Sequence, residues 1–171
     1  MPIKISTNLE ASSEKCCDSK RIVILGIGNM LMKDEGIGVH VVHQLHKQDL
    51  PEYVEIIDGG TSGLDILLSQ EGSYKLIVID AVRADNKPGT IYKTEYLAPR
   101  PAWGFSPGQS KASLHQLGLI EALAAAEKMS CAPGEVIIIG VEPEEINLGL
   151  ELSESVKRSI PKIIEQVLEE I

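Results

Sequence analysis

Four strongly apolar runs recur along this chain of 171 residues, with helix-like segments between or after them. The runs are RIVILG from Arg21, VEIID from Val54, KLIVIDA from Lys75 and EVIIIGV from Glu135. Near-continuous apolar runs are typical of parallel strands that helices cover on both faces of a sheet. Helical periodicity follows at 36–48, 64–68, 113–129 and 153–170. The alternation predicts an α/β fold around an open, twisted, mostly parallel sheet with right-handed crossovers and helices on both faces.

A fifth strand breaks this alternation. Only eight residues, 82–89, separate KLIVIDA from the strand-like segment TIYKTEY at 90–96. A parallel neighbour requires a crossover of a dozen residues or more, so this strand is predicted to run antiparallel. The chain length suits one domain with one core. We therefore expect a single α/β domain over 21–171 with about five strands, one of them antiparallel.

Composition and charge limit where the protein can be located and what it can bind. Residues 1–20 are polar and aperiodic, which predicts a disordered N-terminal tail without the apolar middle of a signal peptide. No run approaches the roughly 18 apolar residues of a membrane span, so we expect no membrane insertion and a cytoplasmic location. A net charge of -9 argues against nucleic acid as a partner. The three cysteines form no CxxC pair and are expected to be reduced thiols.

Three side chains are predicted to meet at one edge of this sheet. Glu35 follows the first strand, Asp80 closes the third, and His115 opens the helix predicted at 113–129. Ligands of open α/β sheets bind beyond the carboxyl ends of the parallel strands, where the loops carrying these residues converge. Two carboxylates and an imidazole form a possible metal site. Taken singly, Asp80 could instead accept hydrogen bonds from loop amides, and His115 could be an ordinary first-turn residue.

Other motifs admit different interpretations. The segment DGGTSG at 58–63 is either part of the same site or a tight turn between a strand and a helix. Gly26 and Gly28 begin a dinucleotide-binding pattern, but Leu31 replaces its third glycine, and nearby acids would repel a phosphate. A nucleotide-binding enzyme therefore stays as the alternative. The proline-rich segment 97–112 is either a lid or a plain connector. His40, His43 and His46 are predicted to lie on a solvated helix face.

The motifs GIGNMLMKDEGIG, DGGTSGLDIL, VIDAV, HQLGL and IIIGVEP occur in this order from about residue 26 onward. In this combination the chain resembles the endopeptidases that mature nickel-iron hydrogenases by trimming the C-terminus of the large subunit. The resemblance implies a precursor of that large subunit as partner and nickel as the metal, supplied by the substrate, with no organic cofactor. It assigns Glu35, Asp80 and His115 as the residues that recognise the nickel.

The resemblance also implies roles in catalysis and substrate binding. Asp58 and Asp80 are the carboxylates expected to take part in peptide hydrolysis, and Gly59, Gly60 and Thr61 are expected to contact the substrate. A non-catalytic chaperone that senses the metal would use the same three ligands. That chaperone would leave the precursor at its original length, which distinguishes it from a protease.

Overall fold

The computed structural model of the protein describes residues 20–62, 66, 73–96, 119, 123–128 and 132–171. Its strands are β1 (Ile22–Ile27), β2 (Val54–Gly60), β3 (Lys75–Ala81), β4 (Ile91–Tyr96) and β5 (Glu135–Val141). Its helices are the short 3-10 helix η1 (Lys33–Gly36), α1 (Ile37–Leu45) and α4 (Glu154–Leu168). Residues 119 and 123–128 are also helical, within the helix predicted at 113–129. The predicted tail, apart from Lys20, and the segment 97–112 lie outside the described residues.

The strands form one five-stranded sheet in the order β2-β1-β3-β5-β4. β1 pairs in parallel with β2 and β3, and β3 pairs in parallel with β5. β4 is antiparallel, as its short connection predicts, but its partner is β5 rather than the preceding strand. β5 can occupy that position because the chain between Tyr96 and Glu135 is long enough to return to β3. The predicted sheet, with its one antiparallel strand, is confirmed.

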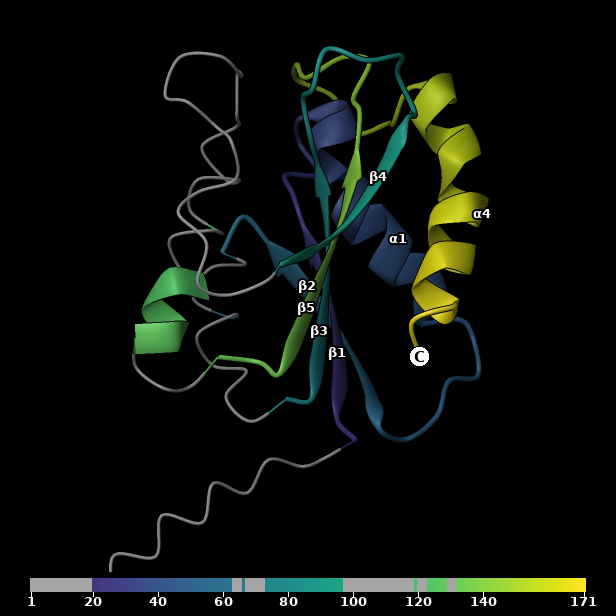
Figure 1. Cartoon of the computed structure of the whole chain (residues 1–171). Coiled ribbons are helices and arrows are strands. Elements are labelled where there is room, and N and C mark those ends of the chain that lie inside the picture. The colour runs from purple at the N-terminus through teal and green to yellow at the C-terminus, as the bar shows by residue number, and fades with distance from the viewer. Residues whose placement is uncertain (1–19, 63–65, 67–72, 97–118, 120–122, 129–131) are drawn as a thin grey trace, which may run out of the picture.

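Helices cover both faces of the sheet (Figure 1). On one face α1 and α4 pack over a core of isoleucine, leucine and valine that includes Ile24, Ile77 and Ile139. On the other face Leu119 and Leu123 pack against a second core cluster that includes Leu25 and Val78. Full burial on both faces explains why β1, β3 and β5 are apolar at nearly every position.

The carboxyl ends of the parallel strands meet at the upper edge of the sheet in Figure 1. The loop after β1 leads into η1 there, and the loops that follow β3 and β5 lie beside it. Two backbone hydrogen bonds, from Gly89 to Glu142 and from Glu142 to Thr90, join these last two loops. Glu35 and Asp80, two of the predicted site residues, are carried at this edge. None of the helices in the described ranges is long and apolar enough to cross a membrane.

Candidate active site

Asp80 has a buried carboxylate with one unpartnered oxygen and a raised pKa. It ends β3 and is only 2% exposed. One of its oxygens accepts a hydrogen bond of 2.8 Å from the backbone N–H of Ala81, whereas Oδ2 is buried without a hydrogen-bond partner. Burial, and to a smaller extent the nearby charge of Glu35, raises the pKa of Asp80 to about 8. An unsatisfied buried carboxylate oxygen is costly, so its retention points to a function.

Glu35 lies close enough to Asp80 to influence its ionisation. It belongs to η1, which packs against β3, and its side chain is half-buried. The charge of Glu35 disfavours the charged form of Asp80, and a cation bound at Asp80 would remove that cost. The sequence-based prediction that the first loop and the third strand bring two acids together is therefore consistent with this geometry.

Asp34 fixes the segment that carries Glu35. Its carboxylate is fully buried and accepts three backbone hydrogen bonds, from Glu144 at 2.9 Å, Glu145 at 3.0 Å and Ser153 at 2.6 Å. These amides belong to the segment between β5 and α4. Asp34 thus ties the loop after β1 to the loop after β5. Sequence analysis did not identify this role, because the acid precedes Glu35 directly and nothing in the pattern separates the two.

Glu142 is a second buried acid that sequence analysis did not single out. It is 4% exposed and follows β5 directly. Its Oε2 accepts hydrogen bonds from the Ala84 backbone at 2.9 Å and the Tyr92 hydroxyl at 2.6 Å. These bonds hold the loop after β3 against β5. It directly follows an apolar strand, as Asp80 stands next to the last residue of one, and this signal was available in the sequence.

Asp58 has a different environment from Asp80. Its exposed carboxylate accepts a hydrogen bond of 3.0 Å from the Gly60 backbone and lies 2.8 Å from Nε2 of His43 on α1. Gly60 adopts a positive φ of 48°, and its carbonyl accepts the Gly28 N–H. The DGG segment is therefore the last part of β2, fastened to the chain just after β1, with Gly59 buried; the turn begins at Thr61, which is exposed.

Strand alternation places the two aspartates on opposite faces of the sheet. Val54 and Ile56, which share a face with Asp58, pack with α1 and α4. Leu76 and Val78, which share a face with Asp80, pack in the cluster of Leu119 and Leu123. Asp80 lies near Glu35, whereas Asp58 pairs with His43 beside α1.

His115 lies outside the described residues, so the third predicted ligand is not placed. Within the described ranges, no group of three His, Cys, Asp or Glu side chains is arranged to hold a metal ion. The described part of the predicted site therefore consists of two carboxylates, one of which has an unpartnered oxygen.

The prediction of a solvated histidine face was wrong for His40. His46 and His43 are exposed, but His40 is half-buried, and its Nε2 is buried without a hydrogen-bond partner. Burial and the neighbouring His43 lower the pKa of His40. The reason is that the segment before α4 and α4 itself lie beside α1: the Leu150 backbone hydrogen-bonds with His40, and Lys157 of α4 is near it. The three-residue spacing of the histidines does not reveal these neighbours.

The glycines that suggested a nucleotide site serve backbone packing. A Cβ built on Gly26 would overlap the Gly38 carbonyl, and a Cβ on Gly28 would overlap the Glu35 carbonyl. A Cβ on Gly38 would in turn overlap the carbonyl oxygens of Ile27 and Ile79. The chain's own backbone thus fills the space above these glycines, which gives the nucleotide interpretation no support.

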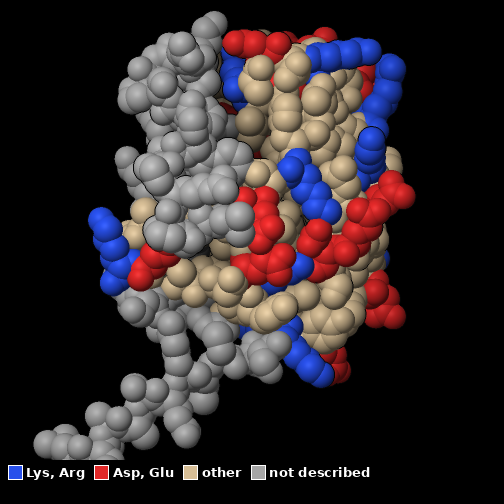
Figure 2. Space-filling model, in the orientation of Figure 1, with Lys and Arg blue, Asp and Glu red and all other residues tan. Residues whose placement is uncertain are grey.

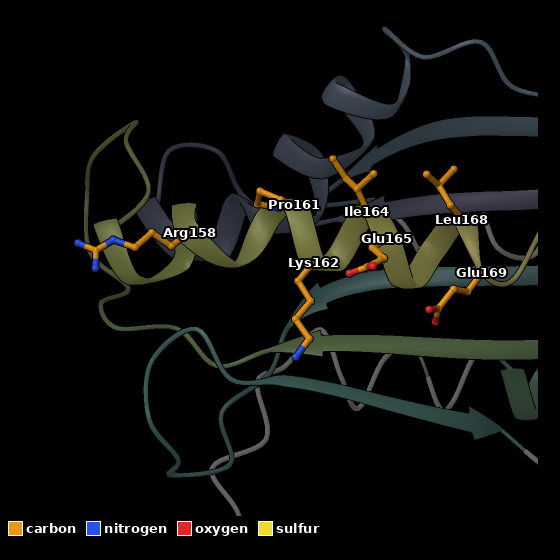
Figure 3. A pocket seen from close by; sticks show the side chains of 7 residues that line it. All are labelled: Arg158, Pro161, Lys162, Ile164, Glu165, Leu168 and Glu169. Atoms are coloured by element: carbon orange, nitrogen blue, oxygen red, sulfur yellow. The ribbon is translucent and has the colours of Figure 1, made fainter.

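A hollow elsewhere on the described surface is formed by α4 and the residue that follows it. Six residues of α4 and the residue that follows the helix line this hollow, as Figure 3 shows: Arg158, Pro161, Lys162, Ile164, Glu165, Leu168 and Glu169. Acidic and basic side chains are interspersed on the face shown in Figure 2. Ion pairs also join side chains of the described residues, such as Glu170 with Lys75 and Lys93. These features are typical of an ordinary solvated surface.

Comparisons with known proteins agree on one family. Residues 39–170 match the family model described as hydrogenase maturation protease. The hydrogenase 2 maturation protease of Escherichia coli is 40% identical over 152 residues, covering 86% of this chain and 88% of that protein. A putative hydrogenase maturation protease of Methanocaldococcus jannaschii is 36% identical over 159 residues, covering 89% of this chain and 97% of that protein.

A solved structure extends the agreement to the fold. The E. coli hydrogenase maturating endopeptidase HybD superposes with a TM-score of 0.75 at 36% identity, covering 88% of this chain and 91% of that one. The resemblance inferred from the ordered motifs is therefore confirmed, and with it the class of enzyme. The chain belongs to the hydrogenase maturation protease family, and it is a peptidase.

Proposed function

We propose that this enzyme removes the C-terminal extension of a nickel-iron hydrogenase large-subunit precursor after nickel has been inserted. The substrate-bound nickel is the element that the enzyme recognises, through Glu35, Asp80 and His115. The single observation that supports this most strongly is the buried Oδ2 of Asp80, which has no hydrogen-bond partner and lies beside a second carboxylate. That arrangement suits a cation brought in by another molecule.

The raised pKa of Asp80 supplies the physical basis for a checkpoint. Without a cation, the carboxyl group is largely protonated near neutral pH, because burial and Glu35 disfavour its charge. A nickel-loaded precursor replaces this proton with the metal, and the ionised carboxylate then becomes a ligand. With a nickel-free precursor the proton stays on Asp80, and the carboxyl group is not available as an ionised ligand. Recognition of the metal is therefore coupled to the charge state of the site.

Hydrolysis of the adjacent peptide bond follows from the same arrangement. A metal ion polarises a carbonyl oxygen or lowers the pKa of a bound water, and a nearby carboxylate accepts the proton that the attacking water loses. Asp80 and Asp58 are the two candidates for this step: Asp80 lies near Glu35, whereas Asp58 pairs with His43 on the other face of the sheet and would serve only a substrate that reaches that face. Gly59, Gly60 and Thr61 offer the loop that contacts the substrate. The nickel remains with the substrate, since its cysteine thiolates are stronger ligands than carboxylates and imidazole. The proposed reaction takes place in the cytoplasm.

The experiment uses purified, nickel-loaded large-subunit precursors, including that of E. coli hydrogenase 2, with intact mass as the readout. The wild-type enzyme is expected to release a C-terminal peptide from a cognate precursor. Glu35→Gln, Asp80→Asn and His115→Ala are each expected to slow that release by at least about a hundredfold. Lys157→Ala, on the exposed surface of α4, is the control and keeps the wild-type rate. Wild-type rates in all three site variants would refute the site assignment.

A metal-sensing chaperone would give a different result in the same assay. It would bind the loaded precursor through the same residues and leave its mass unchanged. An unchanged mass with every precursor, despite binding, would therefore refute the proteolytic function and support the chaperone.

A further inference from the structure

Three leucines near the candidate site are exposed to solvent, unlike the leucines of the core. Leu31 is 61% exposed, Leu148 is 83% exposed and Leu150 is 65% exposed. They make up half of the large apolar side chains that are exposed in the described part of the chain; the others are Tyr53, Tyr74 and Leu168. A single exposed leucine needs no explanation, but a cluster of them marks a surface for interaction.

The leucines are brought together by a backbone bridge. Met32 pairs in parallel with Gly149, so Leu31 lies beside the segment that carries Leu148 and Leu150. The Gly149 N–H donates to the Leu31 carbonyl at 3.0 Å, and the Lys33 N–H donates to the Gly149 carbonyl at 2.9 Å. We name these three leucines the leucine patch.

The leucine patch is continuous with the segment that presents Glu35. Leu31 precedes Glu35 by four residues on the same loop, and Leu148 and Leu150 lie between the amides that bind Asp34. An ion pair of 2.7 Å between Lys33 and Glu145 adds a further link between the two loops. These contacts join the leucine patch to the loop that carries Glu35. A molecule that reaches Glu35 and Asp80 therefore passes beside the leucine patch.

The charges around the patch restrict what can bind there. Lys33 is neutralised by Glu145, whereas the side chain of Glu151, next to Leu150, is 89% exposed. Its cationic neighbour Lys157 is 3.8 Å away and also contacts Glu154 at 3.2 Å. The whole chain has a formal charge of -9. An apolar partner surface with flanking lysine or arginine fits this patch better than an acidic one.

We infer that the leucine patch is the docking surface for the hydrogenase precursor, contacting an apolar segment with basic flanks that lies beside the metal site of the substrate. This inference rests on the proposed function, which requires a protein substrate at Glu35 and Asp80. Leucines buried on docking contribute to binding in the ground state and the transition state alike. Their loss therefore acts on the affinity for the precursor and not on the chemical step.

The test compares Leu148→Ser, Leu150→Ser and the double variant with Leu168→Ser. Leu168 is a matched control, since it is 40% exposed and lies at the opposite end of α4. Cleavage of a nickel-loaded precursor is expected to show a KM raised roughly tenfold for each patch variant, with kcat unchanged. The control retains the wild-type KM. An unchanged KM in the double variant, with the wild type active, overturns the docking surface and leaves the protease intact.

A binding measurement separates this inference from the proposed function. The Kd of the same precursor for the wild type and for each variant is measured by biolayer interferometry, which requires no cleavage. If the wild type binds but does not cleave, a weaker Kd in the patch variants alone supports the docking surface while the protease fails. Absence of binding to the wild type overturns both. A wild-type dimer in sedimentation that Leu148→Ser dissociates assigns the patch to a second copy of the chain, and so also overturns it.

Discussion

Replacing Asp80 by asparagine is expected to stabilise the enzyme while it abolishes precursor cleavage. The amide keeps an oxygen that accepts the Ala81 N–H, and it never carries a charge. Wild-type Asp80, in contrast, keeps its proton in the folded protein up to about pH 8 but ionises in the unfolded chain, so unfolding becomes more favourable as the pH rises. The variant thus keeps the shape of the side chain and removes the effect of its ionisation on the free energy of unfolding.

The magnitude follows from the pKa of Asp80, which rises from 3.8 to about 8 on folding. The folded protein therefore binds an additional proton between these pH values. Its stability is greatest below the unfolded pKa and is lost as the pH rises through the folded one. Each pH unit in this window removes about 1.4 kcal/mol of unfolding free energy. Between pH 5 and pH 7 the asparagine variant should gain about 3 kcal/mol over wild type.

Thermal unfolding in a chelator-containing buffer measures this difference. A gain of about 3 kcal/mol corresponds to a melting-temperature advantage that widens by about 6 to 12 °C between pH 5 and pH 7. Groups common to both proteins cancel in the comparison. A difference between variant and wild type that stays constant over this range would refute the reasoning, because it would show that Asp80 ionises in the folded state as it does in the unfolded state.

Four further substitutions test the packing that supports the site, each by chemical denaturation at fixed pH. Gly38→Ala should lower the free energy of unfolding by about 3 kcal/mol or more, since its Cβ would meet backbone on two strands. Gly60→Ala, whose Cβ lies 3.9 Å from the nearest atom, should lower it by only about 1–2 kcal/mol through its positive φ. Equal losses in the two variants would contradict this account. Asp34→Ala should cost about 3–5 kcal/mol by leaving three amides unpaired, so a loss below about 1 kcal/mol would exclude the anchoring role. Tyr92→Phe should cost about 1.5 kcal/mol, the value of one hydrogen bond to a charged acceptor, and no loss would mean that water replaces the hydroxyl.

The sheet could be predicted from the sequence because strands that are buried on both faces have a recognisable, continuous apolar pattern. Strands β1, β3 and β5 are apolar at almost every position, and their bounds in the structure differ from the predicted ones by at most one residue at each end. The antiparallel direction of β4 followed from the length of its connection. Its pairing with β5 did not, because the connection length limits direction but does not choose between two edges of a sheet.

The site could be predicted only in part. An acid at or directly after the end of a buried strand was a usable signal for Asp80, and the same signal pointed equally to Glu142, which instead holds a loop through Ala84 and Tyr92. The burial of His40 by α4 and the segment before it, and the three amides on Asp34, arise from contacts over more than a hundred residues of sequence. No local pattern encodes such contacts.

The comparison of a nickel-loaded with a nickel-free precursor tests the central claim most directly. Each is incubated with the wild-type enzyme, and its intact mass is measured before and afterwards. The proposed checkpoint predicts that only the loaded precursor loses a C-terminal peptide. Equal cleavage of both precursors would contradict recognition through substrate-bound nickel, and cleavage of neither, across the precursor panel, would contradict the proposed processing of the large subunit.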